Sequence, residues 1–271
     1  YASEAVDAPL SYWGCPGGSQ DTLPTLTQQR TYGPAIQACF DNPTIASEAD
    51  AAAVSWRFYA GSISGDGALW NAYQADSPIY NGPDWNTNVV SPPAQFLTDI
   101  GNGQLSDITW ITPTYEDSDH PGLNSSTGPA WVTSLVDAIG TSKFWNSTAI
   151  FIMWDDWGGW FDPIKPIHKD YDGLGFRIPL LIVSPYARRG YVTHVQYETA
   201  SVLRFVEDNF GLGQLAASDA RAADPAGDAL DYKQSPRSFK KIAGAKSGDF
   251  WAARQRVPRY RTKPRTFIGD D

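Results

Sequence analysis

Residues 151–163, FIMWDDWGGWFDP, pass from an apolar run directly into two adjacent acids and then two glycines. Asp155 and Asp156 stand among three tryptophans, and carboxylates beside that much apolar surface are costly unless a positive group receives them. A divalent metal ion would neutralise the pair, because hard cations prefer oxygen ligands. The stretch therefore suggests a metal site at Asp155 and Asp156, although adjacent acids after a strand also occur simply at the start of a helix.

Two other polar segments follow apolar runs and carry groups that could take part in chemistry. The segment TYEDSDHPG brings Asp119 and His120, and SPYARRGYVTH brings His194. Ligands of open α/β sheets bind at the carboxyl ends of the strands, so these side chains are expected to converge with Asp155 and Asp156 at one edge. Taken alone, a histidine before a proline is also typical of a plain turn, and clustered aromatic residues are also typical of a core.

The elements that must position these residues form a regular rhythm. ITWITP (108–113), TAIFIMW (148–154) and RIPLLIVSP (177–185) are short apolar runs, as expected for strands buried on both faces. Between and after them, GPAWVTSLVDAIGTS and YETASVLRFVEDNFG have helical periodicity, and the second is expected to stop at Gly211. Strands alternating with helices predict an α/β fold with a mostly parallel sheet and helices on both sides.

Local signals in the sequence predict the structure of the remaining segments. NPTIASEADAAAVSW predicts a helix capped by Thr44, and PPAQFLTDIGNG predicts a short helix that stops at Gly101. Residues 11–40 are expected to be irregular, and residues 60–92 to form a long loop with at most one short helix. No linker divides the chain, so residues 1–271 are interpreted as one domain, with 222–271 as a tail wrapped on its surface.

Composition excludes some classes of partner. The chain has 271 residues, with 21 basic against 30 acidic side chains and a net charge of -9, which argues against nucleic-acid binding. No stretch approaches the roughly 20 apolar residues of a membrane span, so no transmembrane segment is expected. Cys15 and Cys39 could be free buried thiols, but both lie in polar sequence where a thiol would be exposed, so a disulfide is preferred, with an extracytoplasmic location, secreted or periplasmic.

Several of these segments, taken in order, resemble a known family. SDHPG, GPAWVTSLVDAI, WNSTAIFIMWDDWGGWFD, DYDGLGFRIPLLIVSPYARRGYVTH and SVLRFVEDNFGL are similar to the bacterial phosphoesterase family, which holds secreted phospholipases C and related acid phosphatases. The resemblance covers most of residues 10–221, and WDDWGGW within its flanks is its most specific part. It implies a three-layer α/β/α sandwich of the alkaline-phosphatase-like type.

The resemblance also implies roles for particular residues. Asp155 and Asp156 match the acidic pair that binds the catalytic divalent metal ion. Asp119 and His120 match the phosphate-binding element, where the histidine would contact a phosphate oxygen or protonate the leaving group. His194 matches a substrate-binding position near the rim. A metal would lower the pKa of a hydroxyl nucleophile and neutralise charge on the phosphoryl oxygens.

The chain departs from the family pattern in two places. Phe161-Asp162-Pro163 stands where the family usually continues with Asp-His-Val, so one polar contact at the mouth of the site is lost. The family also carries an early strand with a metal-binding Glu-Asn pair and then a Ser or Thr nucleophile, and no Glu-Asn dipeptide occurs in this sequence. The resemblance thus implies that the nucleophile lies in an upstream segment, which could be a separate N-terminal fragment of the same protein.

The resulting hypothesis is metal-dependent hydrolysis of phosphate esters, with phospholipid and phosphomonoester substrates both open and with this chain not active alone. The alternative from another class is a non-catalytic module that binds carbohydrate or lipid. Its supporting feature is the aromatic content of 11 Trp, 13 Tyr and 12 Phe. A comparison of a chromogenic phosphomonoester with a choline phospholipid would separate these interpretations.

Overall fold

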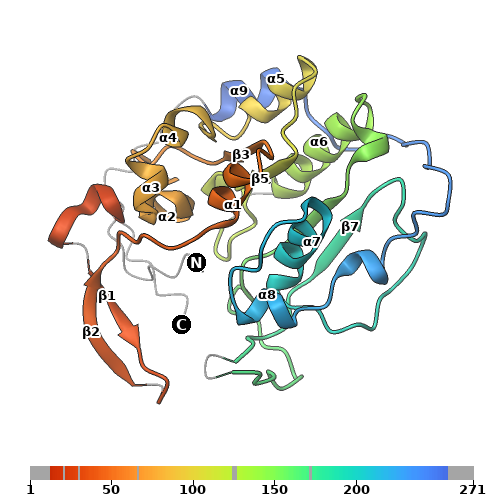
Figure 1. Ribbon diagram of the computed structural model, residues 1–271. Coiled ribbons are helices and arrows are strands. Elements are labelled where there is room, and N and C mark those ends of the chain that lie inside the picture. Colours follow the sequence, from red (N-terminus) through yellow and green to blue (C-terminus); the bar gives the residue numbers. More distant parts are fainter. Residues whose placement is uncertain are drawn as a thin grey trace.

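The structure, a computed structural model, describes residues 13–20, 22–29, 31–65, 67–123, 127–170 and 173–255 (Figure 1). Its strands are β1 (Thr22–Leu26), β2 (Tyr32–Gln37), β3 (Trp56–Tyr59), β4 (Val89–Val90), β5 (Ile108–Ile111), β6 (Ile150–Met153) and β7 (Leu180–Val183). Its α-helices are α1 (Ile45–Ala51), α2 (Gly67–Trp70), α3 (Ser77–Tyr80), α4 (Asp84–Thr87), α5 (Gln95–Gly101), α6 (Gly128–Gly140), α7 (Ala200–Phe210), α8 (Ala217–Arg221) and α9 (Gly248–Gln255). Short 3-10 helices are η1 (Cys15–Gln20), η2 (Ala72–Ala75), η3 (Tyr115–Asp117), η4 (Trp145–Ser147) and η5 (Pro225–Gly227).

A three-stranded parallel sheet in the order β4-β3-β5 lies at the centre of the fold. Side chains of its middle strand point alternately to two faces. Trp56 and Phe58 join a buried cluster with residues of α1 and α7, whereas Tyr59 joins a second cluster with residues of α5 and α6. The chain is therefore a mixed α/β protein with helices packed against both faces of β3, as the alternation of strands and helices predicts.

The last two strands differ from the expected arrangement. β6 and β7 pair with each other in antiparallel orientation, with Ile150 opposite Val183 and Met153 opposite Leu180. The expectation that both would run parallel in one sheet is therefore wrong for this pair. Their apolar residues nevertheless reach the same core, since Ile150 and Val183 pack against the cluster that contains Tyr59.

The predicted helix boundaries agree well with the structure where local capping sets them. Thr44 caps α1, because its hydroxyl accepts a hydrogen bond from the backbone N–H of Ser47 and the Ser47 hydroxyl accepts one from Thr44. α7 ends at Gly211, which has a left-handed φ of 66°. The helix predicted before Gly101 is confirmed as α5.

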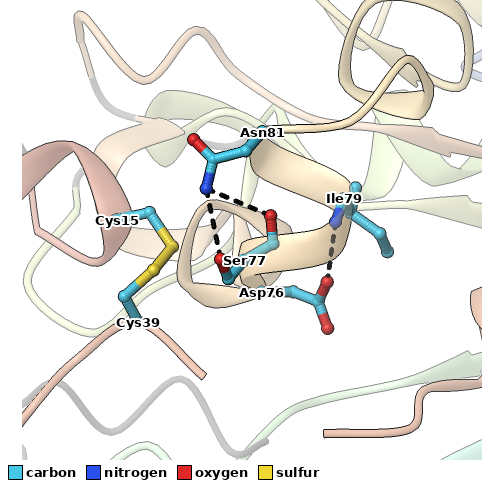
Figure 2. The surroundings of a disulfide bond; sticks show 6 residues. All are labelled: Cys15, Cys39, Asp76, Ser77, Ile79 and Asn81. Carbon is cyan, nitrogen blue, oxygen red and sulfur yellow. Dashed lines mark hydrogen bonds between the residues drawn. A yellow bond between two sulfur atoms is a disulfide. The ribbon is translucent and has the colours of Figure 1, made fainter. Parts of the chain in front are cut away.

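Two stretches are more ordered than expected. Within residues 11–40, β1 and β2 form an antiparallel hairpin, and a disulfide joins Cys15 to Cys39, which confirms that pairing. Figure 2 shows this bond beside α3, whose N-terminus is capped by the Asp76 carboxylate accepting from Ile79 N–H. Residues 60–92 contain α2, η2, α3 and α4, so the expectation of at most one short helix there is wrong.

The C-terminal stretch runs along the outside of the molecule and then docks. Figure 1 shows the blue segment passing from beside α7 to α9, which lies next to α5. The Trp251 side chain on α9 is 0% exposed and packs at 5.1 Å between ring centroids against Trp131 of α6. The indole N–H of Trp251 donates to the Ser134 hydroxyl at 2.9 Å, and the Gln255 side-chain carbonyl accepts from Ala94 N–H at 2.7 Å. The end of this stretch is therefore part of the core.

No helix among the described residues is both long and apolar enough to cross a lipid bilayer.

Candidate active site

Two of the segments singled out in the sequence lie against each other. A turn at residues 155–159 follows β6, and the glycines at its end have left-handed φ values, 62° at Gly158 and 73° at Gly159. The Asp156 carboxylate accepts from Gly158 N–H at 2.5 Å, which folds the turn back on itself. A Cβ on Gly158 would lie 3.2 Å from Cγ of Pro121, so this glycine permits close contact with the Asp119–His120–Pro121 segment.

Both acids of the turn are exposed to solvent. The reasoning that burial among tryptophans would force a counter-charge on them is therefore not supported by their position. Two accessible carboxylates on consecutive residues still suit a hard divalent cation in donor type. Within the described residues no three His, Cys, Asp or Glu side chains come together in a way that could hold a metal ion, so the pair would need ligands from elsewhere.

Asp119 has a backbone conformation that is uncommon for residues other than glycine, although aspartate adopts it more readily than most. Its φ is 64°, in the left-handed region that favours glycine, and such residues concentrate at functional sites. Its carboxylate lies over Gly128, the first residue of α6, where any Cβ would collide with it. Partial burial raises the pKa of Asp119 above its ordinary value.

His120 is held on both its backbone and its ring. Its backbone N–H donates to the Ser118 hydroxyl at 3.1 Å, and its Nδ1 lies 2.9 Å from the Pro121 carbonyl oxygen. Because a carbonyl only accepts, this contact assigns a hydrogen to Nδ1, and the second ring proton of the imidazolium is gained and lost at Nε2. The ring lies 5.3 Å from Tyr115 and 6.1 Å from Trp70, measured between centroids.

Asp117, three residues before His120, anchors this segment to the body of the protein. Its buried carboxylate accepts from the hydroxyls of Thr114 at 3.0 Å and Thr127 at 2.8 Å. It also accepts from Arg254 Nε at 2.9 Å and Gln255 Nε2 at 3.3 Å, both at the end of α9. This ion pair was not predicted from the sequence, because Arg254 lies in the C-terminal stretch interpreted as a surface tail. No local signal in the sequence connects Arg254 with Asp117.

His194 lies in a different environment. It is an exposed residue in the segment after β7, and because β7 runs antiparallel to β6, that segment leaves the strand pair at the end opposite the 155–159 turn. The convergence of His194 with the acidic pair at one sheet edge, expected from parallel strands, is therefore not supported by the strand directions.

The segment that carries His194 is fixed by a single carboxylate. The Asp228 carboxylate accepts from the hydroxyls of Tyr191 at 2.6 Å and Tyr197 at 3.0 Å, and also from Thr193. These bonds, with that of Thr193 first, hold the pKa of Asp228 below its ordinary value. His194 thus lies on a loop that is hydrogen-bonded on both sides of it to the Asp228 carboxylate.

Comparisons with known proteins agree with the segments described above. A family model described as the Phosphoesterase family matches residues 17–213. The chain is 28% identical over 196 residues to phospholipase C B of Mycobacterium tuberculosis (strain CDC 1551 / Oshkosh), a match that covers 59% of this chain and 37% of that protein. It is 26% identical over 253 residues to the non-hemolytic phospholipase C of Pseudomonas aeruginosa, which covers 76% of this chain and 36% of that protein. Against the non-hemolytic phospholipase C of Burkholderia pseudomallei the identity is 28%, covering 59% of this chain and 28% of that protein, so the chain spans about a third of these relatives.

Proposed function

Because the chain belongs to the Phosphoesterase family, we propose that it forms part of an enzyme that hydrolyses phosphate esters, with phospholipids as the substrate class. The observation that carries this proposal is the contact of Gly158 with Pro121, which brings the 155–159 turn against the segment of Asp119 and His120. The segment that carries carboxylates for a metal and the segment that carries an imidazole for a phosphate thereby adjoin. The names of the relatives, all phospholipases C, favour a phospholipid over a phosphomonoester.

In this proposal Asp155 and Asp156 are the ligands that this chain gives to a divalent metal ion. Their exposed carboxylates have the donor type for it, and the bond from Gly158 N–H orients Asp156. The remaining ligands would have to come from outside the described residues. When bound, the ion supplies charge neutralisation at the phosphoryl oxygens and activation of a hydroxyl nucleophile.

His120 would act on the phosphate or on the leaving group through Nε2. The Pro121 carbonyl keeps a hydrogen on Nδ1, so the proton that the imidazolium can release is the one on Nε2. The aromatic rings of Tyr115 and Trp70 limit the orientations of the imidazole. Asp119, with its raised pKa, would repel a phosphate less than an ordinary carboxylate as the pH falls. A substrate contact by His194 rests on the family resemblance alone, because its loop, tied to Asp228, leaves the strand pair at the end opposite the 155–159 turn.

The nucleophile in this proposal is a Ser or Thr of an upstream segment that also supplies a central strand. Among the described residues β5 is the last strand on its side of the parallel sheet, and β6 pairs with β7 only. Yet Ile111 of β5 and Ile150 of β6 pack on the same buried cluster. One more strand between them would join the two sheets into the middle layer of an α/β/α sandwich of the alkaline-phosphatase-like type. The Cys15–Cys39 disulfide supports an oxidising compartment, outside the cell or in the periplasm.

The test of the site uses hydrolysis and metal content together. In a longer form that supplies the nucleophile and the other ligands, Asp155→Asn and Asp156→Asn should each lower the metal content, and His120→Asn should lower hydrolysis of a choline phospholipid. His168→Asn is the control, because His168 is an exposed histidine that has no role in the proposal. Unchanged metal content in both aspartate variants would refute the ligand assignment.

The test of the upstream segment uses the chain by itself. Purified 271-residue chain should hydrolyse neither a chromogenic phosphomonoester nor a choline phospholipid at a measurable rate. Hydrolysis by the chain alone, as a single species of 29.7 kDa, would refute an external nucleophile. Specific binding of a carbohydrate without hydrolysis by any longer form would instead favour a non-catalytic module.

A further inference from the structure

The loop between β6 and β7 presents large apolar side chains to solvent. Trp160 is 77% exposed, Phe161 81%, Ile164 51% and Ile167 45%. We call these four side chains the apolar tip. Figure 1 shows the green loop that carries them projecting at the bottom of the view, away from the helices. Single exposed apolar residues are ordinary, but four within eight residues are not, because each leaves a large apolar area in water.

The loop is held in shape by contacts at its base. The Arg177 guanidinium donates to both carboxylate oxygens of Asp162, at 2.6 and 2.9 Å, and Leu174 N–H donates to the Ile167 carbonyl at 2.7 Å. The Phe176 ring lies 4.9 Å from that of Trp157, measured between centroids. These contacts fix the conformation of the loop, so the apolar tip is exposed on an ordered part of the protein.

The charges of the loop are positive around the apolar tip. Asp162 and Asp170, the two acids within residues 160–170, are each paired with an arginine, Asp162 with Arg177 and Asp170 with Arg221 at 2.5 Å. Lys165 and Lys169 are interleaved with the exposed isoleucines and are themselves exposed. With Arg177 and Arg221, residues 160–170 have an excess of two positive charges on a chain whose net charge is -9, whereas Asp155 and Asp156 lie in the neighbouring 155–159 turn. Aromatic side chains with adjacent lysines match the chemistry of an anionic lipid–water interface.

The position of the loop connects this surface to the candidate site. Trp160 follows Gly159 directly, and Cδ1 of its ring would lie 3.4 Å from a Cβ on Gly158, the residue that contacts Pro121. A lipid surface in contact with the apolar tip would therefore lie next to the 155–159 turn. The phosphate of a phospholipid sits at the depth where interfacial aromatic rings reside, so docking there would bring substrate and site together.

We propose that the apolar tip inserts into the surface of a membrane that contains anionic lipid and holds the candidate site at the level of the headgroups. The lipid nature of the substrate rests on the proposed function, whereas the docking itself rests on the exposed side chains and lysines alone. The surface commits to a bilayer as its partner, since its aromatic and basic composition is that of an interfacial anchor.

The test is cosedimentation of the full chain with vesicles of phosphatidylcholine, with and without phosphatidylglycerol. The protein should bind the anionic vesicles more tightly. Trp160→Ser with Phe161→Ser should weaken binding by about tenfold or more, because two buried aromatic anchors are lost. Tyr32→Ser is the matched control, since Tyr32 is 83% exposed on the β1–β2 hairpin.

The charge arm uses a second matched pair. Lys165→Gln with Lys169→Gln should weaken binding to the anionic vesicles by about thirtyfold and have little effect on neutral ones. Lys240→Gln with Lys241→Gln is the control, because these two lysines are also exposed but lie outside the loop. Equal losses in both pairs would show only general charge attraction and would overturn the assignment to this loop.

Wild-type protein separates failure of this inference from failure of the proposed function. Vesicle binding that depends on the apolar tip, without phospholipid hydrolysis by any longer form, would support docking and refute the enzymatic proposal. Hydrolysis with binding that is unchanged in the Trp160→Ser, Phe161→Ser variant would support the enzyme and overturn the docking. Absence of binding to every vesicle would also overturn it and would leave a protein as the partner of this surface.

Discussion

Glu207 is a buried acid whose ionisation should set the pH dependence of stability. It lies on α7 and is 1% exposed, and in the described part of the chain neither of its carboxylate oxygens has a hydrogen-bond partner. Burial, reinforced by the nearby carboxylates of Asp219 on α8 and Glu48 on α1, raises the pKa of Glu207 to about 7. Asp219 and Glu207 do not reach hydrogen-bond geometry, and Arg204, the cation on the same helix, pairs with Asp208 at 2.6 Å.

The sign and size of the effect follow from the two pKa values. Glu207 binds its proton more tightly in the folded state than at the ordinary value of 4.5, so its contribution to stability is fully present below pH 4.5 and is lost as the pH rises through 7. The whole shift corresponds to about 3 kcal/mol in the free energy of unfolding. Between about pH 5.5 and about pH 8 the loss is about 2 kcal/mol, or about 4 to 8 °C in Tm for a chain of this size.

Glu207→Gln should remove this dependence, because an amide of the same shape cannot ionise. The measurement is thermal unfolding followed by circular dichroism at pH values from about 5 to about 8.5. The variant should become more stable than wild type only at the upper end of the range. Asp208→Asn is the control, since that acid is on the same helix but half exposed in a surface ion pair worth little. If wild type and Glu207→Gln lose stability in parallel as the pH rises, Glu207 is already ionised in the folded protein and the reasoning fails.

Three further predictions concern contacts far apart in the sequence. Arg254→Ala should lower the free energy of unfolding by about 3 kcal/mol, because it leaves the buried Asp117 charge without its cation, and Arg254→Lys should recover part of this loss in urea titrations; equal losses in the two variants would contradict a role of the charge. Trp251→Ala should cost about 3 to 5 kcal/mol in the same assay, since its indole is fully buried, and a cost below about 1 kcal/mol would mean that α9 is not docked in solution. Reduction of the Cys15–Cys39 bond, with a separation of 24 residues, should lower stability by about 3 kcal/mol in the chain-entropy model, and alkylation of native protein should modify no thiol unless the bond is absent.

Local signals in the sequence predict the elements whose ends are determined by their own residues. Thr44 caps α1 and Gly211 stops α7 by contacts within a few positions, so both boundaries could be read directly. The short helices of residues 60–92 could not, because each has only four residues and depends on its surroundings. The direction of β7 could not be predicted either, because an apolar run of four residues is equally compatible with parallel and antiparallel pairing.

Some features of the candidate site could likewise be predicted from the sequence, and others could not. The order of apolar runs predicts that the 155–159 turn and the His120 segment lie close together; the structure brings Gly158 against Pro121, and the roles of the site residues stay a prediction. The pairing of Asp117 with Arg254 was not predictable, because 137 positions separate the two residues and neither belongs to a recognisable pattern. Long-range partners of buried charges are decided by packing, which a single sequence does not display.

The docking of α9 has a consequence for the order in which the protein is completed during synthesis. Residues of β3, β5 and α6 can assemble their core while the ribosome is still adding the C-terminal stretch. Asp117, however, meets Arg254 and Gln255 only when those residues have emerged, more than 130 positions later. Until then the Asp117 carboxylate has no cation at the position where it will be buried. The His120 segment should therefore be the last part of the candidate site to take its final form.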